Sequence, residues 1–162
     1  MRRKDREVTD TEQIREILTN SKILHLGMFD DEYPYIVPMH YGFEYDGSSI
    51  TFYVHCAKEG HKLDLIRNNS SVFAELETDI ELISGKEACN YGSAYSSVML
   101  RGKAEIIQDP KEKMKGLSLL MKTQTGKDFE ISEQMASAVT VIRITSDSYT
   151  AKSRPKPSHM QK

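Results

Sequence analysis

The residues best suited to chemistry form one continuous segment, HCAKEGHK at 55–62. A β-type run at 49–54 precedes it and an amphipathic stretch at 63–67 follows it, so the segment joins a strand to the start of a helix. Helix starts carry free backbone N–H groups and the positive end of the helix dipole, which together bind anions. With His61 and Lys62 at this start, the segment predicts a site for the phosphate of a cofactor.

The same segment admits two other interpretations, a metal site and a reactive thiol. His55, Cys56 and His61 are metal-ligand types, but zinc also requires a fourth ligand or a positioned water, and neighbouring strand residues 55 and 56 point to opposite faces. We therefore predict no metal. Cys56 follows an apolar strand and is expected to be a small buried hydrophobe, while Cys89 has no identified base beside it.

Composition excludes several classes of protein. The 162 residues fit one domain, and a net charge of −2 with a pI near 6.2 provides no basic field for nucleic acid or an anionic membrane. No apolar run approaches the roughly 20 residues that span a bilayer. Two cysteines and no apolar signal core predict a reduced, cytoplasmic protein. The glycines lack the spacing of a Rossmann or Walker loop.

The elements that must position the segment are mostly strands. Apolar and β-branched runs predict six strands, and turn residues at Asp30-Asp31 and Asp46-Gly47 predict hairpins between them. The predicted strands cover 23–28, 35–45, 50–55, 72–82, 95–108 and 139–145. Helices are expected over 9–20 and from Asp109 onward. The predicted class is α+β, a six-stranded antiparallel split β-barrel with flanking helices. The domain covers 1–152, and 153–162 form a flexible tail.

Alternation along the strands separates an aromatic face from a polar one. Tyr35, Val37, Met39, Tyr41, Phe43 and Tyr45 share one side, and His40 points to the other. Pro38 removes a donor, so it should lie at an edge or bulge where the amides of Met39 and His40 can turn toward a ligand. Ser97 and Arg101 share a second face farther along, whereas His25 is expected to be a satisfied core histidine.

Short motifs in a fixed order connect the chain with a known family: YPYIVPM at 33–39, YDG at 45–47, FYVHCAKEGHK at 52–62, SV at 97–98, and Gly102. In this order the chain resembles the FMN-binding split barrels related to pyridoxamine 5′-phosphate oxidase, and most closely their nitroimidazole-resistance (NimA-like) branch. The resemblance spans roughly residues 8–152. It implies a homodimer with two FMN sites built between subunits. No Trp is present, so the activity of the name-giving oxidases is not expected.

The resemblance also implies where the cofactor lies. The flavin ring is expected along 37–41, the phosphate near His61 and Lys62, and Ser97 as a contact of the flavin. His40 and His55 are expected to be catalytic and to line the substrate side. The full set of expected cofactor-binding residues is Val37, Pro38, Met39, His40, His55, Ala57, His61, Lys62, Ser97 and Arg101.

The function expected from this resemblance is an FMN-dependent oxidoreductase that reduces a small oxidised acceptor, such as a nitroaromatic or a quinone. Two alternatives stay open. One is haem binding or haem breakdown on the same barrel with His40 or His55 as axial ligand, which a Soret band would indicate. The other is a non-catalytic flavin-binding module, which steady turnover of a reductant would exclude.

Overall fold

The structure is a computed structural model that describes residues 3–157. Its helices are α1 (Thr11–Asn20), α2 (His61–Asn68), α3 (Pro110–Thr125) and α4 (Glu133–Ser137), with 3₁₀ turns η1 (Lys4–Arg6) and η2 (Ala88–Asn90). Its strands are β1 (Glu7–Val8), β2 (Leu24–Asp30), β3 (Tyr33–Met39), β4 (Tyr41–Tyr45), β5 (Ile50–Cys56), β6 (Ser71–Ile83), β7 (Gly92–Ile106) and β8 (Thr140–Arg154).

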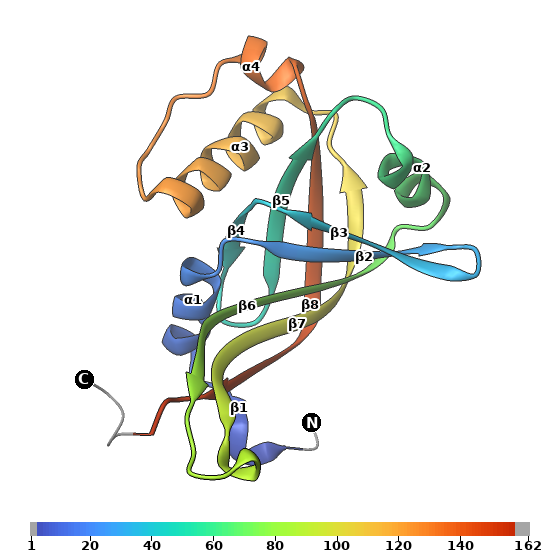
Figure 1. Ribbon diagram of the computed structural model, residues 1–162. Helices are drawn as coiled ribbons and strands as arrows, with labels where there is room; N and C mark the ends of the chain where they lie inside the picture. The colour runs from blue at the N-terminus through green and yellow to red at the C-terminus, as the bar shows by residue number, and fades with distance from the viewer. Residues whose placement is uncertain (1–2, 158–162) are drawn as a thin grey trace.

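The strands form one antiparallel sheet in the order β3-β2-β6-β7-β8-β5-β4, with β1 paired to β8. The sheet curls around a single core, and the β2–β3 and β6–β7 hairpins extend beyond it (Figure 1). The predicted α+β split barrel is confirmed. The predicted number of six strands was wrong, because the sheet has eight.

The split of one predicted strand accounts for one of the two additional strands. The run 35–45, predicted as one strand, is interrupted at His40. Before the interruption β3 pairs with β2, and after it β4 pairs with β5, so the chain passes from one edge of the sheet to the other. The predicted alternation survives the break, since Met39, Tyr41 and Tyr45 are all buried while His40 is exposed. The eighth strand is the two-residue β1.

The predicted Asp46-Gly47 hairpin is confirmed between β4 and β5. The Asp46 carboxylate accepts hydrogen bonds from the backbone N–H groups of Ser48 and Ser49, at 2.8 and 2.7 Å. These bonds, the one from Ser49 first, hold the pKa of Asp46 below its usual range. Gly47 has a φ of 93°, a conformation that L side chains rarely adopt.

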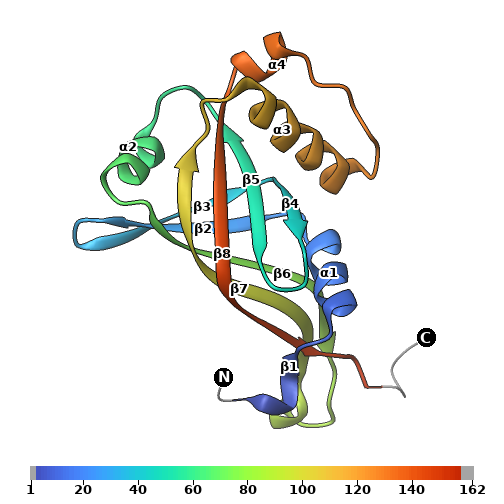
Figure 2. The same ribbon diagram turned by 180° about the vertical axis from the view of Figure 1, so that it is seen from behind.

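Both predicted helix starts are confirmed, and the second of these helices packs closely on the sheet. Asp10 caps α1 by accepting from the N–H of Gln13 at 2.8 Å, and Asp109 caps α3. Helix α3 packs on the outer side of β4 and β5 in both views (Figures 1 and 2). A Cβ on Gly42 would lie 2.2 Å from the backbone N of Leu120, so only glycine permits this approach.

Strand β8 continues nine residues past the predicted end at Thr145. Its second half pairs with β7, with Ala151 opposite Val98 and Arg154 opposite Tyr95. The first two residues of the predicted tail, Ser153 and Arg154, therefore belong to the sheet, while 158–162 lie outside the described residues. Within 3–157, none of the helices has the length and apolar character needed to cross a membrane.

Candidate functional site

The junction between β5 and α2 has the geometry of an anion site. Gly60 precedes the helix with a φ of 146°, which only glycine adopts readily, and it has no side chain to cap the helix. The N–H of Leu63 bonds to the carbonyl of Gly60 at 2.9 Å. In the described part of the chain, the N–H groups of His61 and Lys62 donate to no acceptor. Two backbone donors therefore remain available to a ligand.

The two cations of the junction differ in their partners. The Nε2 of His61 lies 2.7 Å from a carboxylate oxygen of Asp30, the last residue of β2, and the ring of His61 meets the ring of Tyr35 edge-on at 5.0 Å. Lys62 is half-buried and has no carboxylate within ion-pair distance among residues 3–157. Lys62 is therefore the cation left to bind an external anion. Sequence reasoning missed Asp30, which it had treated only as a turn residue.

The Lys62 ammonium also acts on the neighbouring thiol. Partial burial raises the pKa of Cys56, and the Lys62 charge lowers it by a smaller amount. The Cys56 side chain packs against the core, as the sequence predicted. A thiol with a raised pKa is a weak nucleophile near neutral pH, which agrees with leaving Cys56 out of the catalytic residues.

The structure brings the two predicted catalytic histidines together. The pairing of β4 with β5 ends at Tyr41 and Val54, the residues next to His40 and His55, and the charge of His40 acts on His55. The His40 Nδ1 lies 3.1 Å from Oε1 of Gln124 in α3 and 3.3 Å from the carbonyl of Lys22. Partial burial, and secondarily the charge of His40, lower the pKa of His55. The His55 imidazole is therefore neutral at pH 7 and able to accept or donate a proton.

The predicted ring-binding residues lie on a sheet edge. β3 is the terminal strand, so the backbone groups that point away from β2 have no further strand to bind. Pro38 lies on this edge, as predicted. The Met39 side chain is in the core with 8% of its surface exposed, and Val37 packs against that core, so only their backbone atoms can meet a planar ligand.

The other two predicted cofactor contacts lie apart from the junction. Ser97 and Arg101 share the outer face of β7, where Ser97 pairs with Glu77 and Arg101 with Phe73. Arg101 lines a groove of about 1200 Å³, and no residue of 55–62 lines that groove. In a single chain Arg101 therefore lines a different surface from the predicted phosphate site.

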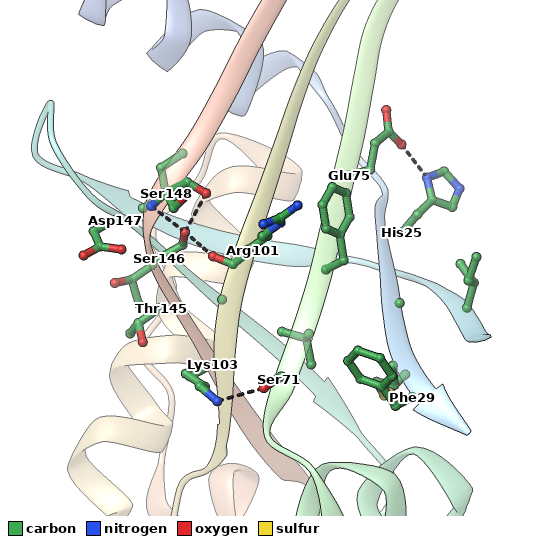
Figure 3. Close-up of a pocket in the computed structure, with 18 of the residues that line it drawn as sticks. His25, Phe29, Ser71, Glu75, Arg101, Lys103, Thr145, Ser146, Asp147 and Ser148 are labelled. Atoms are coloured by element: carbon green, nitrogen blue, oxygen red, sulfur yellow. Dashed lines mark hydrogen bonds and ion pairs between the residues drawn. The ribbon is translucent and has the colours of Figure 1, made fainter. Parts of the chain in front are cut away.

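The groove crosses the outer faces of β2, β6 and β7 and ends at a bend in β8 (Figure 3). At the bend the pairing of β7 with β8 shifts, and Ser146 Oγ donates to the carbonyl of Arg101 and accepts from the N–H of Ser148 at 3.0 Å. Lys103 donates to Ser71 Oγ at 2.8 Å. The apolar residues that line the groove include Phe29, Ile36 and Phe73.

A cluster of three metal-ligand side chains lies at one end of the groove. The Nδ1 of His25 lies 3.4 Å from a carboxylate oxygen of Glu75 and 3.6 Å from one of Glu77, and Figure 3 shows His25 directed at Glu75. Burial first, and then Glu77, raise the pKa of Glu75 to about 7. The expectation that His25 is a core histidine was wrong, since 38% of its side chain is exposed and it faces outward. Its neighbours Leu24 and Leu26 point inward, an alternation that could have revealed this.

The fold is a split β-barrel, and comparison with known proteins identifies its family. The family model described as pyridoxamine 5′-phosphate oxidase matches residues 10–153. The chain belongs to the pyridoxamine 5′-phosphate oxidase family. A comparison with curated protein sequences finds no match.

Solved structures agree with this membership. A crystal structure from Bacteroides thetaiotaomicron, described as a 5-nitroimidazole antibiotic resistance protein, is 30% identical, with a TM-score of 0.76 over 91% of this chain and 86% of that one. The flavocytochrome Anf3 from Azotobacter vinelandii is 20% identical, with a TM-score of 0.75 over 97% of this chain and 73% of that one. An FAD- and haem-binding protein from Mycobacterium smegmatis is 16% identical, with a TM-score of 0.74 over 94% and 76%. The last two similarities concern the fold alone.

Proposed function

We propose that the protein is a cytoplasmic flavoprotein that binds FMN as a homodimer and reduces a small oxidised acceptor, such as a nitroaromatic or a quinone. The observation that carries this proposal is the β5–α2 junction, where, among residues 3–157, Lys62 has no carboxylate partner and lies beside two helix N–H groups without an acceptor. Family membership and the 30% identity to a protein described as a nitroimidazole resistance protein support it. Cys56 and Cys89 are both free thiols, which suits a reducing compartment.

The junction fits a phosphate better than it fits a neutral ligand. The N–H groups of His61 and Lys62 would donate to phosphate oxygens, and the Lys62 ammonium would add a charge-assisted bond. Asp30 carries the opposite sign, but the imidazole of His61 lies 2.7 Å from it and offsets its charge when protonated. Lys62 would therefore attract the phosphate, and the ion pair with Asp30 would hold the His61 side chain in place.

The remaining candidate residues can each be given a role around the cofactor. Bound FMN would supply the redox chemistry, the acceptance of electrons from a reductant and their transfer to the acceptor. The free edge of β3 offers backbone groups to a planar ring. His55, neutral at pH 7 and next to His40, is suited to proton transfer on the substrate side.

The different locations of the two groups of candidates support the homodimer. Ser97 and Arg101 lie on the outer face of β7, away from the junction of the same chain. If both residues contact FMN, a second subunit must present them to it. A cofactor site shared between two copies would meet this condition.

The absorption spectrum of freshly purified protein, with cofactor analysis and sizing, tests the proposal. We expect flavin bands, one FMN per chain, a dimer at dilute concentration, and oxidation of NADH or NADPH when a quinone or nitroaromatic is added. Protein that lacks flavin and does not bind added FMN would contradict the cofactor. A Soret band would favour haem instead, and a flavin-retaining monomer would contradict the shared site.

A further inference from the structure

The outer face of the sheet holds a cluster that the flavin does not explain, the His25–Glu75–Glu77 cluster. We propose that it binds one divalent transition-metal ion, with Zn²⁺ as the best fit. His25 comes from β2 and the two glutamates from β6, so the sheet itself holds the ligands in register. The proposal is independent of FMN binding.

The distances from His25 to the two glutamates match the separation of two ligand atoms around one tetrahedral ion. His25 is directly opposite Glu75, and Glu77 follows two residues later on the same face. The two separations from His25 Nδ1 are 3.4 and 3.6 Å, and one ligand atom from each of the three residues lies within 4.8 Å of the others. A tetrahedral ion with bonds of about 2.1 Å separates its ligand atoms by about 3.4 Å.

The same separations are too long for ordinary hydrogen bonds, which span roughly 2.7–3.2 Å for N–H···O. His25 therefore bonds tightly to neither glutamate. A bridging ion would replace these long contacts with metal–ligand bonds of about 2.1 Å.

The charges of the cluster also favour a cation. Glu75 and Glu77 place two carboxyl groups close together on one strand face. The charged neighbours with the largest effect on the Glu75 carboxyl are Glu77, which raises its pKa, and His25, which lowers it. A divalent ion would neutralise both carboxylates.

The donor set selects the kind of ion. One imidazole nitrogen and two carboxylate oxygens suit Zn²⁺, whereas Mg²⁺ and Ca²⁺ prefer more oxygen ligands. His25 and Glu75 also line the groove, so the fourth position would open onto it. Three protein ligands and one open position describe a site that can take water or a small ligand.

Calorimetric titration of the tag-free protein as purified, with ZnCl₂, tests the site. We expect one Zn²⁺ per chain in the wild type, and an association constant at least about tenfold lower in His25→Asn and in Glu77→Gln. Glu130→Gln is the matched control, since Glu130 is exposed and lies outside the cluster. Affinities of all variants within twofold of the wild type would overturn the proposal.

A second measurement locates the ion without any substitution. Wild-type crystals soaked in ZnCl₂ should give an anomalous difference peak at the zinc edge, within bonding distance of His25 Nδ1 and of both glutamates. A peak only at other residues, or no peak, would overturn the proposal even if the variants failed to fold.

Discussion

The β5–α2 junction and the outer-face groove differ in size, charge and origin. The junction is small, presents two free amides and one unpaired lysine, and comes from eight consecutive residues. The groove has a volume of about 1200 Å³, has apolar walls with charges of both signs, and comes from several strands. The junction therefore suits a compact anion, and the groove suits an extended surface or a larger ligand.

The two regions also differ in how much of the fold they need. A helix start fixes a phosphate through short-range bonds that require no other part of the fold. The groove depends on the pairing of β2, β6, β7 and β8, so its residues act together only in the finished sheet. Substitutions in the two regions should consequently affect different properties.

The largest expected effect is at the junction. Lys62→Ala removes a charge-assisted bond worth about 1.5–3 kcal/mol, so FMN affinity should fall roughly 10- to 100-fold with the unfolding temperature nearly unchanged. Fluorescence titration of flavin-free protein with FMN measures it. Lys58→Ala, an exposed lysine of the same loop, is the control and should bind FMN as the wild type does. Equal affinity in Lys62→Ala would place the phosphate elsewhere.

The next effect belongs to the groove and concerns stability. The pKa of Glu75 rises from 4.5 to about 7 on folding, so the folded state holds a proton that the unfolded state has released between these values, and stability falls as pH rises through this window. Glu75→Gln cannot ionise. In EDTA it should be about 1 kcal/mol more stable than the wild type at pH 8, after allowance for solvent screening, and similar at pH 4.5.

Urea unfolding at the two pH values measures this gain, with Glu130→Gln as the exposed control. A gain of the same size at both pH values would mean that packing, and not ionisation, causes the difference in stability between Glu75→Gln and the wild type.

A smaller effect tests whether the two regions cooperate. If Arg101 contacts FMN from a second subunit, Arg101→Gln should weaken FMN binding about two- to fivefold, because the guanidinium is exposed and screened. Lys103→Gln, two residues along the same face, should change the affinity less. Flavin affinity unaffected by Arg101→Gln would limit the cofactor site to the junction and the β3 edge.

The smallest expected effect is at the paired histidines. Replacing His40 with Gln removes one charge that lowers the pKa of His55, so the pKa of His55 should rise toward its ordinary value without reaching it, because burial is the larger cause. In the wild type the pKa of His55 is lower in the folded than in the unfolded protein. The neutral His55 therefore contributes stability above the ordinary histidine pKa, and this stability is lost as pH falls through the folded-state pKa. NMR titration of the His55 imidazole measures this pKa. An unchanged pKa in the His40→Gln variant would mean that His40 does not act on His55.

Local patterns predicted more of the junction than of the groove. The 55–62 segment, the Asp46-Gly47 hairpin and the caps at Asp10 and Asp109 all follow from neighbouring residues, and the structure confirms the hairpin and the caps. The expected residue roles at the junction remain predictions. The second half of β8 was missed because its exposed positions are polar, and pairing with β7, not local apolar patterning, holds it in the sheet.

The sequence alone determined the alternation of faces, the strand-to-helix junction and the family resemblance, because each depends on residues close together in the chain. Tertiary structure decided the rest. Whether 35–45 forms one strand or two depends on which edge each half joins, and that choice is made by distant strands. The meeting of His25 with Glu75, about fifty residues later, likewise depends on the register of β2 with β6, which local sequence does not encode.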